Sequence, residues 1–313
     1  MSSSLAVFLV GAALSGDLST AAKLSSRPRW CAPPAPRAGE PSAPDAWDQV
    51  REQGRQQFCR RLARAELALG TDPELASRLA AELARDLPQR AEPLVLEARA
   101  QTRRRAFGEA WRFWEAAQQR GAEPLSAHAL RDYAVSAALT GRSEAALAAY
   151  RRLLPLLQAW PDPIEQQAIY LEAGVAAMQR GPDGLEEAMG QLAAARARAS
   201  STGLRALSVG LSALAAARRG QSSDSESRLD APEVWHFIAT VQSGRFPGRW
   251  PALPPHELFG AAALLIEPYS DTAAAELWAR HAAGLEQSAA PAAWRALAAE
   301  HLKRTSSSPR RSP

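Results

Sequence analysis

Residues 91–124, AEPLVLEARAQTRRRAFGEAWRFWEAAQQRGAEP, carry the pattern that decides the fold. The stretch holds two helix-length segments, which are separated by a short break at residues 105–106. Ala98 in the first segment and Ala110 in the second are small, while Phe107 and Trp114 are large. Small residues facing large ones let two helices interdigitate closely, and a short connection makes them antiparallel. The stretch therefore predicts one helix hairpin of 34 residues.

The same arrangement recurs on both sides of this hairpin. The second-helix alanines Ala76, Ala110, Ala146 and Ala188 follow one another at spacings of 34, 36 and 42 residues. The extra residues fall in turns, where repeats tolerate insertion. After residue 199 the pattern weakens into a helix over 204–219 with a displaced partner at 232–242, a hairpin of 257–267 with 271–283, and a capping helix over 292–303.

These spacings and small positions resemble the tetratricopeptide (TPR) repeat family, whose unit is a 34-residue helix hairpin. The likeness covers residues 57–200 well and 204–303 loosely, and Glu97 stands where the family usually has Leu. The resemblance implies an all-α fold, an α-α superhelix built as a TPR-like solenoid of antiparallel hairpins, in a bacterial protein. It also implies a non-catalytic scaffold or adaptor that holds a partner segment in its concave groove.

Composition agrees with an all-α fold. Hydrophobic residues make up 46% of the chain and aromatic ones only 6%, and most of the apolar content is Ala and Leu, which favour helices. The net charge of +4 arises from arginines that alternate with glutamates, so we expect solvated helix faces and no nucleic-acid stripe. The alternative function is a cytosolic regulatory or nucleic-acid-associated helical repeat protein that uses these arginines.

We expect six regions in the chain. They are a signal peptide over 1–16, a Pro-rich disordered linker over 17–44, TPR-like repeats over 45–219, a polar linker over 220–231, degenerate repeats with a capping helix over 232–303, and a disordered tail over 304–313. The apolar run over 5–14 is too short to span a membrane and is followed by small residues, as in a signal peptide. It predicts export to the periplasm or medium. The alternative is an apolar helix that docks on the repeats of a cytoplasmic protein.

The chain has two cysteines, Cys31 and Cys59. Their spacing fits no zinc or haem motif. In an oxidising compartment the pair could form a disulfide that ties the Pro-rich linker to the first helix. In the cytosol Cys59 would be a small apolar residue.

The candidate partner-binding residues lie on the first helix of each hairpin, which lines the concave side of stacked repeats. Arg99, Arg103, His128 and Arg131 would make this surface electropositive and suited to an acidic or carboxylate-bearing protein segment. The alternative is that these arginines are ordinary solvated side chains. Phe246 and Trp250, in a Pro/Gly-rich loop, are either a second docking contact or pack back onto the repeats.

No catalytic motif is apparent in the sequence. His256-Glu257 lacks the second histidine of a HExxH zinc site, and no GxSxG or phosphate-loop pattern occurs. We therefore expect no enzyme activity, no cofactor, no metal and no small-molecule substrate.

Overall fold

The computed structural model describes residues 31, 46–122, 126–198, 201–221, 229–245, 251–288 and 290–307. Within these ranges the regular elements are all helical and no strand occurs, so the all-α prediction is confirmed. The expected signal peptide, the Pro-rich linker apart from Cys31, and the loop residues Phe246 and Trp250 lie outside the described residues.

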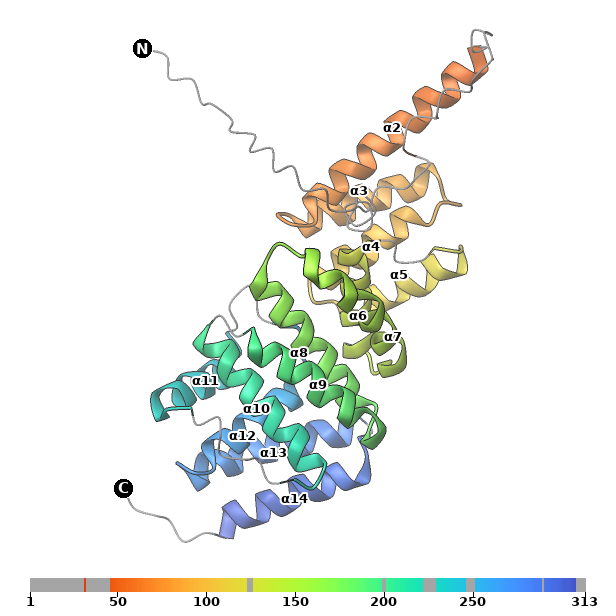
Figure 1. Cartoon of the computed structure of the whole chain (residues 1–313). Coiled ribbons are helices and arrows are strands. Elements are labelled where there is room, and N and C mark those ends of the chain that lie inside the picture. Colours follow the sequence, from red (N-terminus) through yellow and green to blue (C-terminus); the bar gives the residue numbers. More distant parts are fainter. Residues whose placement is uncertain are drawn as a thin grey trace, which may run out of the picture.

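The described chain forms 13 α-helices in succession (Figure 1). Their bounds are α2 Ala46–Ala68, α3 Pro73–Asp86, α4 Glu92–Arg103, α5 Phe107–Gln119, α6 Ala127–Leu139, α7 Ser143–Leu153, α8 Pro163–Gln179, α9 Leu185–Ala197, α10 Thr202–Arg218, α11 Ala231–Ser243, α12 Pro255–Ile266, α13 Asp271–Gln287 and α14 Ala292–Ser307. Two short 3-10 helices, Leu154–Ala159 and Pro182–Gly184, flank α8. The last helix continues four residues into the region expected as a tail.

Local sequence explains where many of these helices begin. Asp72 accepts a hydrogen bond from the backbone N–H of Leu75 at 2.9 Å, and Asp162 caps α8 in the same way through Ile164. In both helices the next residue is a proline, whose fixed φ suits the first helical turn. Gly141 makes the tight turn between α6 and α7 with a positive φ of 77°. A residue with a side chain would adopt this backbone conformation only at a cost in free energy.

Consecutive helices pack as pairs in the first part of the chain. α4 packs against α5, α6 against α7 and α8 against α9, while α4, α6 and α8 also contact one another in turn. The small positions Ala98 and Ala110 have no exposed surface, as the hairpin pattern predicts. Trp114 fills the space beside them, with its ring centroid 5.4 Å from that of Tyr133 on α6.

The pairing changes in the second half. The expected partner of α10 was the helix at 232–242, but α10 packs more on α12 and α9 than on α11. Gly210 permits this contact, because a Cβ atom there would lie only 3.0 Å from the carbonyl oxygen of Ala261. α12 then pairs with α13, and α14 packs on α13, as expected for a final hairpin and a capping helix.

The N-terminal end of the structure is anchored on α2. Cys31 and Cys59 are joined by a disulfide, and both lie in an apolar cluster with Phe58 and Leu62. The first three turns of α2 extend beyond the other helices (Figure 1), and Trp47 on them is 72% exposed.

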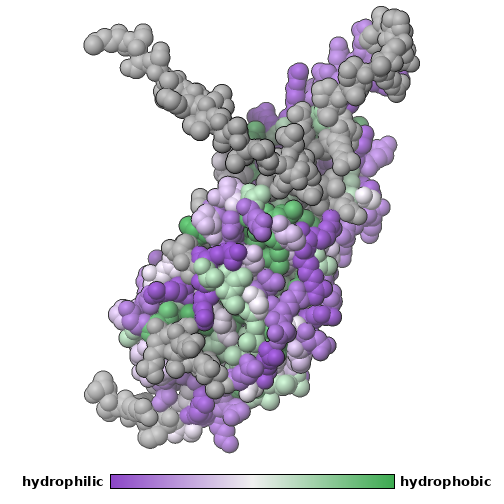
Figure 2. Space-filling model, in the orientation of Figure 1, coloured by the Kyte–Doolittle hydropathy of each residue, from purple (hydrophilic) through white to green (hydrophobic). Residues whose placement is uncertain are grey.

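The surface in Figure 2 is mainly hydrophilic, with patches of apolar residues between the hydrophilic ones. In the described ranges, no helix is both long enough and apolar enough to cross a bilayer.

Candidate functional site

A row of salt bridges links the first helices of successive pairs. Nε of Arg99 on α4 donates to Oδ2 of Asp132 on α6 at 2.9 Å. One layer further along, Arg131 on α6 donates to both carboxylate oxygens of Glu172 on α8, at 3.1 and 2.9 Å. We call the face of α4, α6 and α8 that carries these four residues the ladder face. It repeats one chemical pattern, in which an arginine pairs with an acid of the next first helix.

Further polar contacts extend the ladder face. Arg99 also donates to Glu66 on α2, and Nε of Arg103 lies 3.3 Å from Oδ1 of Asp132. Asp132 is therefore shared by two guanidinium groups. Arg103 is the accessible one, with 36% of its side chain exposed, against 5% for Arg99.

Both buried guanidinium groups keep their charge. Burial by itself would lower the pKa of Arg99, but the negative charges of Asp132 and Glu66 outweigh it, so the pKa is raised. Burial by itself would also lower the pKa of Arg131. The charge and hydrogen bonds of Glu172 act in the opposite direction, and the pKa is raised. Each positive charge is matched by a carboxylate within hydrogen-bonding distance. The ladder face therefore contains charged groups, but a neighbouring carboxylate balances the charge of each buried arginine.

The predicted binding residues thus occur together, but with partners that the sequence did not reveal. Arg99, Arg103 and Arg131 lie on adjacent first helices. The missed residues are the acids that they bind: Glu66, Asp132 and Glu172. One signal for this pairing is present in the sequence, because Asp132 directly follows Arg131. Adjacent residues on a helix project in different directions, so these two can pair with two different neighbouring helices.

His128 lies at the beginning of α6, where its ring packs at a tilt of 36° against Trp160, with 4.5 Å between centroids. Burial lowers the pKa of this histidine, and the positive charge of Arg99 lowers it further. Both effects favour the neutral form of the His128 ring.

A segment of the chain itself lies on the ladder face. The backbone N–H of Ala252 donates to Oε1 of Glu172 at 3.0 Å, across 80 residues of sequence. Pro251, Leu253 and Pro254 are buried, and Pro254 has the extended φ and ψ of −59° and 132°. Under this segment only 1% of the Glu172 side chain is exposed. We call residues 251–254 the internal strap.

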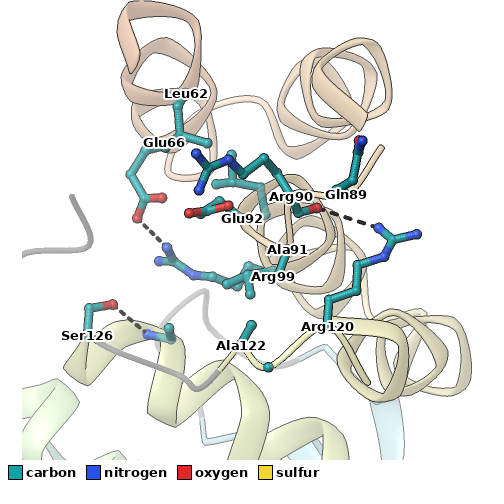
Figure 3. A pocket seen from close by; sticks show the side chains of 14 residues that line it. Leu62, Glu66, Gln89, Arg90, Ala91, Glu92, Arg99, Arg120, Ala122 and Ser126 are labelled. Atoms are coloured by element: carbon teal, nitrogen blue, oxygen red, sulfur yellow. Dashed lines mark hydrogen bonds and ion pairs between the residues drawn. The ribbon is translucent and has the colours of Figure 1, made fainter. Parts of the chain in front are cut away.

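A pocket of about 480 Å³ opens next to Arg99, between α2, α4, the end of α5 and the start of α6 (Figure 3). Figure 3 shows Glu66 and Arg99 pointing toward one another at its wall, with Leu62 above them on α2. Val95 and Leu96 of α4 add apolar lining, and Arg120 stands at the opposite side, where it reaches the carbonyl oxygen of Arg90 at 3.5 Å.

A second cleft, of about 850 Å³, lies between the α6–α7 turn and helices α12 to α14. Glu257 on its wall is paired with Arg218, whose Nη2 lies 2.8 Å from the carboxylate, and both side chains are buried. Burial would raise the pKa of Glu257, but the charge of Arg218 together with the contacts of His256 and His281 outweighs burial, so the pKa is lowered. The guanidinium of Arg218 also stacks over Trp294, 4.0 Å from the ring centroid. This cluster joins α10, α12 and α14.

The described residues contain no group of three or more side chains placed to hold a metal ion, His256 and Glu257 included. Comparison of the chain with protein-family models and with curated proteins gives no match. The described residues define an all-α helical protein.

Proposed function

We propose that the chain is a TPR-like α-α superhelix that serves as a non-catalytic scaffold or adaptor, binding an extended segment of a partner protein on its ladder face. One observation carries this proposal: the ladder face already holds an extended peptide, the internal strap, through the main-chain hydrogen bond between Ala252 and Glu172. A surface that binds one extended segment in cis has the chemistry to bind another in trans.

The arrangement of the first helices supports the same proposal. α4, α6 and α8 contact one another in turn, so their polar groups form a continuous row. Stacked helix hairpins use such extended surfaces for binding partners. The expected preference for an acidic segment now depends on Arg103, because Arg99 and Arg131 are neutralised by buried or half-buried carboxylates.

We also propose that the protein is exported. The disulfide between Cys31 and Cys59 supports this, because disulfides persist in oxidising compartments and are rare in the cytosol. N-terminal sequencing of the protein from its host should give a chain that begins soon after Ser15, with both thiols unreactive. An intact Met1 together with two reactive thiols would favour the cytoplasm.

Capture of partners by matched variants tests the scaffold function. The full chain is immobilised as wild type, as Val95→Arg on the half-buried wall of the pocket next to Arg99, and as Leu67→Arg on α2, where the side chain is 79% exposed. Proteins captured from the host are identified by mass spectrometry. We expect Leu67→Arg to retain the partner and Val95→Arg to lose it, with unchanged helicity in both. Equal capture by all three chains would contradict the proposal.

A further inference from the structure

We infer that the pocket in Figure 3 binds a proline-flanked apolar segment of the partner, held by a main-chain N–H donated to Glu66 as the internal strap is held by Glu172. The inference rests on the proposed function and specifies the chemistry of the partner segment. Its evidence is that two glutamates, Glu172 and Glu66, are each held by an arginine of a neighbouring first helix, and that one of them already binds a main-chain N–H.

The first pair shows how a peptide is bound. Oε1 of Glu172 accepts a hydrogen bond from Arg131 at 2.9 Å and another from the N–H of Ala252 at 3.0 Å. The arginine fixes the carboxylate, and the carboxylate orients the peptide. A charge-assisted hydrogen bond of this kind is stronger than one between neutral groups.

The second pair joins the same two kinds of group, but its acid lies on the preceding helix α2 instead of the following one. Arg99 donates to Glu66, and Asp132 holds the same guanidinium from the other side. Glu66 keeps 28% of its side chain exposed, whereas Glu172 under the internal strap keeps 1%. Because Glu66 lines the pocket, its carboxylate offers an approaching N–H the kind of acceptor that Glu172 offers Ala252.

The pocket walls fit an apolar side chain. Leu62, Val95 and Leu96 line it, and its volume of about 480 Å³ lies within the roughly 300–1,000 Å³ typical of ligand pockets. Leu253 of the internal strap is likewise buried beside its own carboxylate contact. The bound segment should therefore place an apolar residue next to the residue that donates its N–H.

The bound segment does not have to carry a negative charge, because the most buried arginine of the pocket already has carboxylate partners. The lining includes three arginines and two glutamates, and the most buried arginine, Arg99, is already paired twice. Flanking prolines suit this site, since they lack an N–H that would need its own acceptor and they hold the chain extended before it binds. The internal strap has this composition, with Pro251 and Pro254 around Ala252 and Leu253.

A peptide with the sequence of residues 251–255, Pro-Ala-Leu-Pro-Pro, labelled with fluorescein, is the probe. Its binding to the full chain is measured by fluorescence polarisation, for wild type, Glu66→Gln and the control Glu186→Gln. Glu186 is an exposed acid that pairs with Arg219 on another part of the surface. In Glu66→Gln the guanidinium of Arg99 keeps Asp132, so the fold should be retained, which circular dichroism checks.

We expect Glu66→Gln to weaken binding about tenfold or more, from the loss of one charge-assisted hydrogen bond. Glu186→Gln should leave binding unchanged. A probe with N-methyl-alanine should bind the wild type about as weakly as the normal probe binds Glu66→Gln. A photo-leucine probe should cross-link to α2 and α4.

Three outcomes would overturn the inference: no binding to the wild type, equal affinity for Glu66→Gln, or cross-links on α8, where the probe would have replaced the internal strap. If the probe fails while capture of a host partner still depends on Val95, the scaffold function stands and only this inference is wrong. Failure of both would remove the proposed function as well.

Discussion

At the residue scale, His281 shows how burial sets the charge of a side chain. It lies between α12 and α13 with 1% of its surface exposed, and its Nδ1 is 2.7 Å from the carbonyl oxygen of His256. Burial lowers its pKa from 6.5 to about 4, although the carboxylate of Glu257 acts in the opposite direction. The folded state therefore binds fewer protons at this site than the unfolded state between these two pH values.

We predict from this that the free energy of unfolding falls as the pH drops from 6.5 to 4, with about 3 kcal/mol of the loss due to His281. The sign follows because protonation favours the unfolded chain in this window. His281→Gln, which does not titrate, should show a correspondingly shallower loss when urea unfolding is measured from pH 7 to pH 4. Equal slopes for both proteins would contradict the prediction.

Ala110 is the residue on which the hairpin of α4 and α5 depends. It has no exposed surface, so Ala110→Leu should overpack this contact and lower the free energy of unfolding by about 1–3 kcal/mol. The control is Ala148→Leu on α7, where the alanine is exposed and leucine fits without a clash. Thermal unfolding measures both variants. A melting temperature that stays at the wild-type value in Ala110→Leu would show that this position is not a close contact.

At the scale of elements, residues that are close in sequence decide where helices begin, and distant residues decide how they pair. Asp162 and Pro163 define the start of α8 by contacts within three residues, so the sequence predicts it. The pairing of α10 with α12 depends on Gly210 and Ala261, which meet across 51 residues. Neighbouring helices usually pack together, which is why 232–242 was expected instead.

The internal strap provides a prediction at this scale. Ala252→Pro removes the N–H that Glu172 accepts and should lower the free energy of unfolding by about 1.5–3 kcal/mol, the range for a hydrogen bond to a charged group. Ala252→Ser keeps the N–H and should remain within about 0.5 kcal/mol of the wild type. Urea unfolding compares the three chains. If proline and serine have the same effect, the main-chain contact does not stabilise the fold.

At the scale of the whole molecule, the core is divided along the chain into three apolar clusters. The first contains the disulfide, α2, α3 and part of α4, and the second runs from α4 to α8. The third and largest joins α8 to α14 and includes Leu147 of α7. Residues 46–57 of α2 contribute no buried residue to any cluster. Stability should therefore differ between the ends of the molecule.

Amide hydrogen exchange measures this difference. We predict the fastest exchange among the described helices at residues 46–57, where backbone hydrogen bonds open without the loss of buried contacts. The slowest exchange should occur in α10 and α12, which lie inside the largest cluster and contact each other closely. Uniform protection along the chain would mean that the three clusters unfold as one unit.

The order of residues is enough to predict that this chain is helical and that residues 91–124 form a hairpin. Helical periodicity, caps and small residues such as Ala98 act through near neighbours in the chain, so they are visible in the order of residues. The tertiary structure decided the site. Arg99 and Arg131 meet acids 33 and 41 residues away, and the N–H of Ala252 reaches Glu172 from 80 residues away. From the sequence alone these arginines are expected to offer their charge to a partner. In the folded protein a stacked helix places a carboxylate beside each of them and neutralises that charge.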